Sequence, residues 1–71
     1  MKPEPITVLA NGKLEQIQPP CSVAEFVVAH GWKVTQVVIE RNGHVLGRDE
    51  LGRVMLGSGD HLEVIVPVAG G

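Results

Sequence analysis

The feature that most restricts the fold of this chain is a single, clearly bounded helix signal between segments that favour strands. Ser22 and Glu25 have the spacing of a capping box, in which each side chain accepts a hydrogen bond from the other residue's backbone N–H. Gly31 suits the left-handed residue that ends a helix. Between these signals, one stripe of side chains recurs with helical spacing: Val23, Phe26, Val27 and His30. We therefore expect one helix from Val23 to His30.

The segments on either side of this helix predict two β-hairpins. Residues 6–17 begin with alternating side chains, and residues 37–46 begin with three β-branched residues. Asn11-Gly12 and Asn42-Gly43 each supply the positive φ angles that a two-residue type I′ turn requires. Each pair therefore predicts a tight turn between two antiparallel strands.

Smaller signals predict the limits of the strands. Leu14 and Ile17 are three residues apart, so we expect a bulge or an early strand end between them. Pro19-Pro20 ends the second strand, because proline has no N–H to donate to the ladder. After the second hairpin we expect one turn of helix at Asp49–Leu51, a loop at "GSGD" and a last strand within "HLEVIVPV". One face of that strand holds Leu62, Val64 and Val66, and the other holds Glu63 and Ile65.

The predicted order is strand, strand, helix, strand, strand, strand. One helix cannot cover both faces of a sheet, so a single sheet wrapped around that helix is the simplest arrangement. The 71 residues suffice for one such α+β domain. A domain of this size buries only roughly 60% of its unfolded surface. Because so small a core leaves little stability for a deep, strained pocket, we expect function at the surface or at one end.

The composition argues against several classes of function. The six Lys and Arg side chains are scattered singly along the chain, against eight Asp and Glu, so they form no basic stripe for a nucleic-acid backbone. With one Trp, one Phe and no Tyr, the chain also has no aromatic surface on which single-stranded bases could stack. The apolar stretches are far shorter than a membrane span, and no leader sequence is apparent. A single cysteine cannot form an intrachain disulfide, which is typical of a reducing cytoplasm. We therefore expect a cytoplasmic protein that binds neither nucleic acid nor membrane.

No set of side chains has the spacing of a catalytic or metal site. Cys21 has no basic neighbour in the sequence, so a small buried hydrophobe is favoured over a nucleophile. Asp49 and Glu50 fit a solvated turn better than an acid–base pair. We assign no metal, because metal-ligand spacing is absent among the histidines, His30, His44 and His61. We expect neither catalytic activity nor a bound cofactor.

The last six letters, "VPVAGG", form the candidate functional segment. Gly70 and Gly71 have no side chains to bury and lose much conformational freedom on ordering. They therefore suit a narrow, flexible segment that ends in a free carboxylate. An α-carboxylate is ionised at neutral pH but is a poor acyl donor. Attack on the α-phosphorus of ATP would convert it to an acyl adenylate, from which a sulfur nucleophile could displace AMP. Residues 68–71 extend to at most about 13–14 Å, enough to enter a narrow channel in a partner.

The element order, the length and this ending resemble the β-grasp, or ubiquitin-like, fold and, within it, the ThiS-type sulfur carriers of the ThiS/MoaD superfamily. The resemblance covers nearly the whole chain after Pro5 and is most specific in "VVIERNGHVLGRDELGRVMLGSGDHLEVIVPVAGG". Its parts are the Asn-Gly turn, Arg48 followed by Glu50, the Gly59-Asp60 loop and the terminal Gly70-Gly71. Gly47 replaces a proline that is common in the family, and an aromatic residue common near Leu51 is absent. These departures bear on partners more than on the carrier role.

The resemblance implies an α+β roll in which a mixed sheet of about five strands packs on one main helix, with the first and last strands parallel at its centre. It implies a β-grasp domain over residues 1–67 and a flexible tail over residues 68–71. A ThiF-like adenylyltransferase would use ATP to adenylate Gly71, and a cysteine persulfide would supply sulfur for a thiocarboxylate. A ThiG-like thiazole synthase would take that sulfur in thiamine biosynthesis. The residues that thread into these partners would be Val68, Ala69 and Gly70.

In this view the chain is a protein co-substrate rather than an enzyme, and the exposed sheet face beside the last strand is the expected docking surface. Two alternatives stay open. One is a MoaD-like carrier for molybdopterin synthesis, or a carrier for tRNA thiolation or cysteine synthesis. The short segment from Gly31 to Val37 favours the thiazole carrier, because molybdopterin carriers tend to be longer there. The other is a β-grasp module that binds proteins and never activates its C-terminus.

Overall fold

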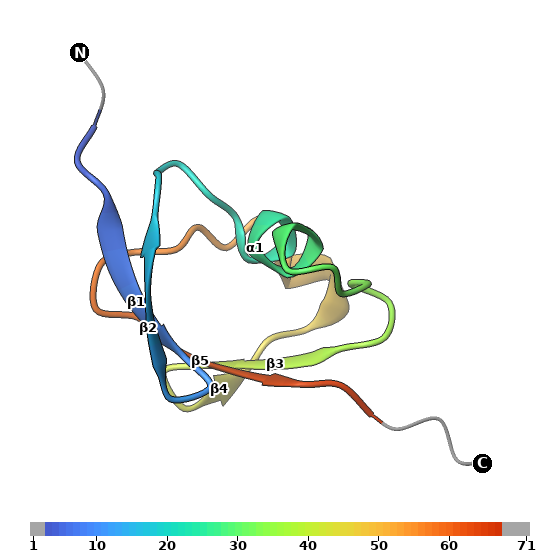
Figure 1. Ribbon diagram of the computed structural model, residues 1–71. Coiled ribbons are helices and arrows are strands. Elements are labelled where there is room, and N and C mark those ends of the chain that lie inside the picture. Colours follow the sequence, from blue (N-terminus) through green and yellow to red (C-terminus); the bar gives the residue numbers. More distant parts are fainter. Residues whose placement is uncertain (1–2, 68–71) are drawn as a thin grey trace.

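One helix covers one face of a five-stranded sheet in the computed structural model, which describes residues 3–67 (Figure 1). In chain order the elements are β1 (Ile6–Ala10), β2 (Lys13–Ile17), α1 (Val23–Ala29), β3 (Val38–Arg41), β4 (His44–Val45), the 3₁₀ helix η1 (Arg48–Glu50) and β5 (His61–Ile65). The predicted order of strands and helix is confirmed. The second hairpin is one residue shorter at each end than predicted, and η1 begins one residue before the predicted turn.

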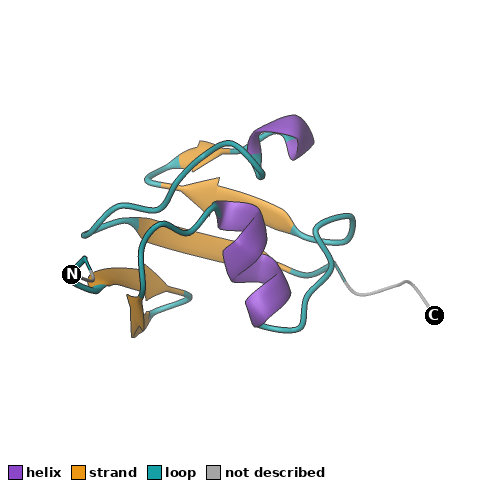
Figure 2. Ribbon diagram, turned by 90° about the horizontal axis from the view of Figure 1, so that it is seen from above, coloured by secondary structure: helices purple, strands orange, loops and turns teal. Residues whose placement is uncertain are grey.

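The first and last strands meet at the centre of the sheet. The strands lie in the order β2-β1-β5-β3-β4, and β1 pairs with β5 in parallel, with Leu9 opposite His61. The other neighbouring strands are antiparallel. Figure 2 shows α1 lying across this sheet. The predicted β-grasp roll, with a mixed sheet on one main helix, is therefore confirmed.

Local sequence signals define both ends of α1. The Ser22 hydroxyl accepts a hydrogen bond from the Glu25 N–H at 3.0 Å, and the Glu25 carboxylate accepts one from the Ser22 N–H at 2.8 Å. The helix ends at Ala29, and His30, which we expected inside it, is the C-cap. Gly31 follows with a φ of 82°, the left-handed conformation predicted for it.

The hydrophobic core fills the space between α1 and the inner face of the sheet. Phe26, near the middle of α1, is 1% exposed and has the largest of the fully buried side chains. The other core residues come from the sheet, the helix, the segment before β3 and the loops that flank η1: Val8, Ala10, Val23, Val27, Val37, Ile39, Leu51, Leu56, Leu62 and Val64. The core thus packs against the central strands. In β5, the buried side chains of Leu62 and Val64 form its inner side.

The two hairpin turns also fasten the last strand. Asn11 and Asn42 have φ angles of 50° and 51°, as type I′ turns require. The Asn42 side-chain oxygen accepts a hydrogen bond from the His61 N–H at 2.8 Å, and that of Asn11 accepts one from the Val64 N–H at 2.7 Å. Because the two amides hold β5 near both of its ends, the chain leaves the sheet from a fixed position.

Two details of the strand prediction were wrong. Strand β2 keeps an unbroken register with β1, so it contains neither the bulge nor the early end that we expected. Leu14 disturbs the apolar pattern because it faces away from the core, opposite Leu9, and is 73% exposed. Strand β5 stops at Ile65, and Val66, which we expected within the strand on the same face as Leu62 and Val64, lies beyond the last paired residue and is 46% exposed.

Candidate functional site

The predicted tail lies outside the residues that the structure describes. The modification of Gly71 and the boundary after residue 67 accordingly stay predictions, as does the threading role of Val68, Ala69 and Gly70. The structure does describe the root of this segment, at Pro67, two residues beyond the end of β5. Since β5 lies between β1 and β3, Pro67 follows the central strand of the sheet.

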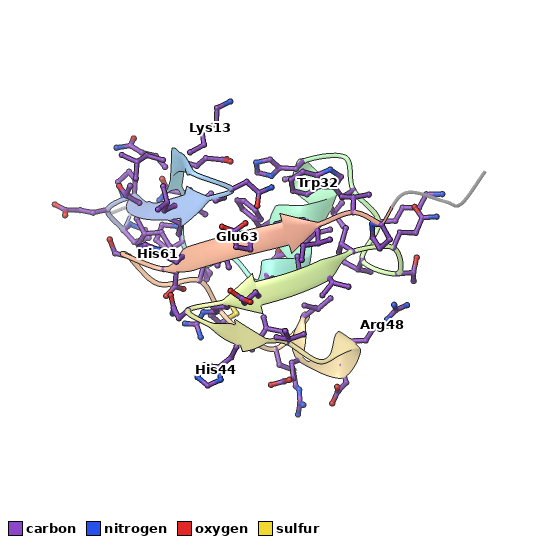
Figure 3. The ribbon with its side chains drawn as sticks, turned by 90° about the horizontal axis from the view of Figure 1, so that it is seen from below. Lys13, Trp32, His44, Arg48, His61 and Glu63 are labelled. Atoms are coloured by element: carbon purple, nitrogen blue, oxygen red, sulfur yellow. The ribbon has the colours of Figure 1, made fainter. Side chains whose placement is uncertain are left out.

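A cleft of about 310 Å³ lies beside this root. Its walls come from the segment that leads into β3, from the first residue of η1 and from the root itself: Thr35, Gln36, Val37, Val38, Arg48 and Pro67. Arg48 is exposed, and Figure 3 shows it at the end of the sheet toward which β5 runs. The cleft therefore places one cationic side chain beside an apolar wall where the chain leaves the sheet.

The short helix η1 positions Arg48. The Glu50 carboxylate accepts a hydrogen bond from the Gly47 N–H at 2.7 Å and so caps the start of this helix. Asp49 is exposed and pairs with Arg53 at 3.3 Å on the surface. The prediction of a solvated turn is thus confirmed for Asp49, whereas Glu50 is a half-buried structural cap.

The sheet face opposite α1, here called the outer face, carries both apolar and acidic side chains. Strand alternation assigns to it His61, Glu63 and Ile65 of β5, Val38 and Glu40 of β3, and Val45 of β4. Each of these side chains is exposed or half-buried, whereas Leu62 and Val64 of β5 point into the core. Figure 3 views the molecule from this side, with Glu63 over the middle of the sheet and α1 behind it. This is the face that we expected to dock partners.

Asp60, directly before β5, is 7% exposed and joins its own loop to the end of β3 and the turn that follows it. Its carboxylate accepts hydrogen bonds from the Gly57 N–H at 2.7 Å, the Asn42 amide at 3.1 Å and Arg41 Nε at 3.0 Å. Burial alone would raise the pKa of Asp60, but these hydrogen bonds and the Arg41 charge outweigh it and lower the pKa below its ordinary value. Sequence reasoning identified only a loop here, although an acidic residue just before the last strand was the available signal.

We predict that Asp60→Ala lowers the free energy of unfolding by about 2 kcal/mol at pH 7, because it leaves the Arg41 guanidinium and two N–H donors without their acceptor. A lowered folded-state pKa stabilises the fold above the unfolded pKa of about 3.9 and ceases to do so as the pH falls through the folded pKa. The difference from wild type should therefore shrink below about pH 4 in urea unfolding curves. Asp49→Ala, on the exposed pair, is the matched control and should change stability by less than about 0.5 kcal/mol. An equal loss for Asp60→Ala at pH 7 and pH 3 would contradict the electrostatic role.

The other reactive side chains have structural roles. Cys21 packs half-buried against the core, and burial raises the pKa of its thiol, with a further rise from the charge of Glu25. The ring nitrogens of His30 lie 2.9 Å from the Phe26 carbonyl oxygen and 2.7 Å from the Glu15 carboxylate, so this ring joins the helix end to β2. Within residues 3–67, no group of three or more His, Cys, Asp and Glu side chains is placed to hold a metal ion. In the same range, none of the helices has the length and apolar character needed to cross a membrane.

Known proteins share this fold and sequence pattern. The model of the ThiS family matches residues 6–71. The crystal structure of the thiamine biosynthesis protein ThiS from Geobacter metallireducens is 26% identical, with a TM-score of 0.77, over 93% of this chain and 100% of that one. The solution structure of a thiamine biosynthesis protein from the same organism gives the same identity and TM-score, over 93% of this chain and 88% of that one. A search of curated proteins gave no match. With the family pattern extending from β1 through Gly71, the chain belongs to the ThiS family.

Proposed function

We propose that this protein is the sulfur carrier for thiazole synthesis in the thiamine pathway, and that Gly71 bears the sulfur as a thiocarboxylate. The observation that carries the proposal is the family match, which includes Gly70-Gly71 as well as the folded body. The names of the two Geobacter relatives, both thiamine biosynthesis proteins, support thiamine as the pathway.

The chemistry starts from a carboxylate that cannot transfer its acyl group unaided. The Gly71 carboxylate attacks the α-phosphorus of ATP in an adenylating enzyme, forming an acyl adenylate and releasing pyrophosphate. The terminal sulfur of a cysteine persulfide then attacks the carbonyl carbon and expels AMP. A thiol reduces the resulting S–S bond and leaves the thiocarboxylate on Gly71, from which a thiazole synthase takes the sulfur. Because glycine has no Cβ, both faces of this carbonyl are open to attack.

The folded domain, residues 3–67, is suited to present that terminus to its partners from a fixed position. Strand β5 is fastened by the Asn11 and Asn42 amides, by its pairing with β1 and β3, and by its buried side chains. Beyond Pro67, four residues reach at most about 13–14 Å, so the reacting carbonyl enters a partner's site while the sheet stays outside. The catalytic groups and the ATP site belong to the partners, and this chain acts as their co-substrate.

The proposal is tested by intact-mass spectrometry of the purified protein after incubation with the adenylating enzyme from the same cell, ATP and a persulfide donor. Wild type should gain the mass difference between sulfur and oxygen, and fragmentation should place it on Gly71. The same measurement without reagents establishes that Gly71 is the last residue, which the mechanism requires. Omission of ATP is the control. No gain in mass with a competent adenylating enzyme would favour a β-grasp module that is never activated.

Sulfur transfer then identifies the pathway. Thiocarboxylated protein should lose its sulfur when mixed with thiazole synthase and the other thiazole precursors. It should keep its sulfur when mixed with molybdopterin synthase and its precursor. The reverse result would assign the protein to molybdopterin synthesis instead.

A further inference from the structure

Two glutamates face each other on the outer face without an internal partner. In the antiparallel register of β3 and β5, Glu40 lies directly opposite Glu63. Directly opposed side chains have Cβ atoms about 4.5–5.5 Å apart, and like charges in such positions destabilise a sheet. Among residues 3–67, neither carboxylate takes part in an ion pair. Within the described residues the two carboxylates therefore have no ion-pair partner to offset their repulsion.

The acidic pair is framed by exposed apolar side chains. The next outward pair toward the tail is Val38 opposite Ile65, and Val45 of β4 lies opposite Glu40 on its other side. These three side chains are all substantially exposed. Figure 3 shows Glu63 in the middle of the face, away from the two labelled cations, Lys13 and Arg48. A partner that covers the apolar frame would therefore also remove both carboxylates from water, which costs free energy unless the partner supplies positive charge.

We propose that the outer face is a docking surface for a protein that inserts one arginine side chain between Glu40 and Glu63. A guanidinium group suits this position better than an ammonium group, because its planar fork of donors can engage two carboxylates at once. It is also more weakly hydrated, so it tolerates the contact with Val38, Ile65 and Val45. The partner's surface around this arginine is apolar, to match that frame.

The identity of the partner rests on the proposed function. Glu63 precedes Pro67 by four residues, about 13 Å along an extended chain. The outer face is therefore within reach of an enzyme that draws residues 68–71 into its active site. The arginine belongs to the adenylating enzyme, and the acidic pair fixes how the sheet is oriented while the tail is threaded.

The test uses the full chain and the purified adenylating enzyme from the same cell, with affinity measured by titration calorimetry without ATP. Glu40→Gln and Glu63→Gln keep the side-chain shape and remove one charge each. Each should weaken binding about tenfold and the double variant about a hundredfold, because the arginine loses charge-assisted hydrogen bonds. Glu4→Gln is the matched control: it removes the same charge from an exposed residue before β1, and its affinity should stay within about twofold of wild type.

Thermal unfolding separates docking from structure. The double variant should unfold at a temperature no lower than wild type, because it relieves repulsion between like charges. A lower unfolding temperature would make the pair a structural element and overturn the inference, as would wild-type affinity in the double variant. Binding that requires added Mg²⁺ would also overturn it, since a bridging metal ion would then replace the arginine. If wild type takes up sulfur and the variants bind equally well, only the docking inference fails. If wild type binds the enzyme but takes up no sulfur, the proposed function fails.

Discussion

Deletion of Gly71 should lower the rate of sulfur loading by at least about a hundredfold. The variant still carries a carboxylate, on Gly70, but that group is about 3.3–3.6 Å short of the position reached in wild type. A misplacement of about 1 Å at a reacting centre can cost a factor of about a hundred. An added alanine after Gly71 should be as damaging, because it turns the Gly71 carboxylate into an amide and moves the free carboxylate outward by a similar distance.

Intact-mass spectrometry over a time course measures this loss, with wild type as the reference. Both variants keep residues 3–67 intact, so their unfolding temperatures should equal that of wild type. Their affinity for the adenylating enzyme should be lowered only by the contacts of the tail, because Glu40 and Glu63 are unchanged. Sulfur uptake by the Gly71 deletion at the wild-type rate would show that another group carries the sulfur, and the proposed chemistry would then be wrong.

Local signals were enough to predict most elements of the fold. The capping box at Ser22 and Glu25 fixes the start of α1, and the two Asn-Gly pairs fix both hairpin turns. Each of these depends on residues within one turn of chain, so no knowledge of the tertiary structure is needed. The single helix then restricts the sheet to one covered face. The parallel pairing of β1 with β5 came from the family resemblance, because no local pattern joins strands 50 residues apart.

Contacts between distant segments could not be predicted. The Asp60 carboxylate reaches Arg41 and Asn42 across 19 and 18 positions of sequence, and Glu40 meets Glu63 only because β3 and β5 pair in one particular register. Leu14 misled the prediction because an exposed leucine opposite Leu9 interrupts the apolar pattern without interrupting the strand. The candidate site divides in the same way. Its tail and the choice of docking face came from the sequence, whereas the residues that make up that face required the register.

Phe26→Ala should have the largest effect on the folded body. This ring is 1% exposed, and its centroid lies 4.2 Å from that of the His30 ring at the end of α1. Replacing a buried phenylalanine with alanine costs about 3–5 kcal/mol, because the surrounding core does not fully close the cavity. At about 0.05–0.15 kcal/mol per residue, a 71-residue domain has about 4–11 kcal/mol of stability in total. The variant should therefore lose a large share of its stability, and urea unfolding with circular dichroism measures the loss.

Val28→Ala is the matched control, because Val28 lies in the same helix and is 63% exposed. It should change the free energy of unfolding by less than about 1 kcal/mol, and a loss similar to that of Phe26→Ala would contradict the assignment of the buried face. Phe26→Ala also complements the Gly71 deletion. It keeps the reactive terminus but destabilises the sheet that presents it, so sulfur loading should fall in proportion to the unfolded fraction and recover on cooling toward the temperature of maximum stability. The Gly71 deletion should show no such recovery, because its fold is intact and only the position of the carboxylate has changed.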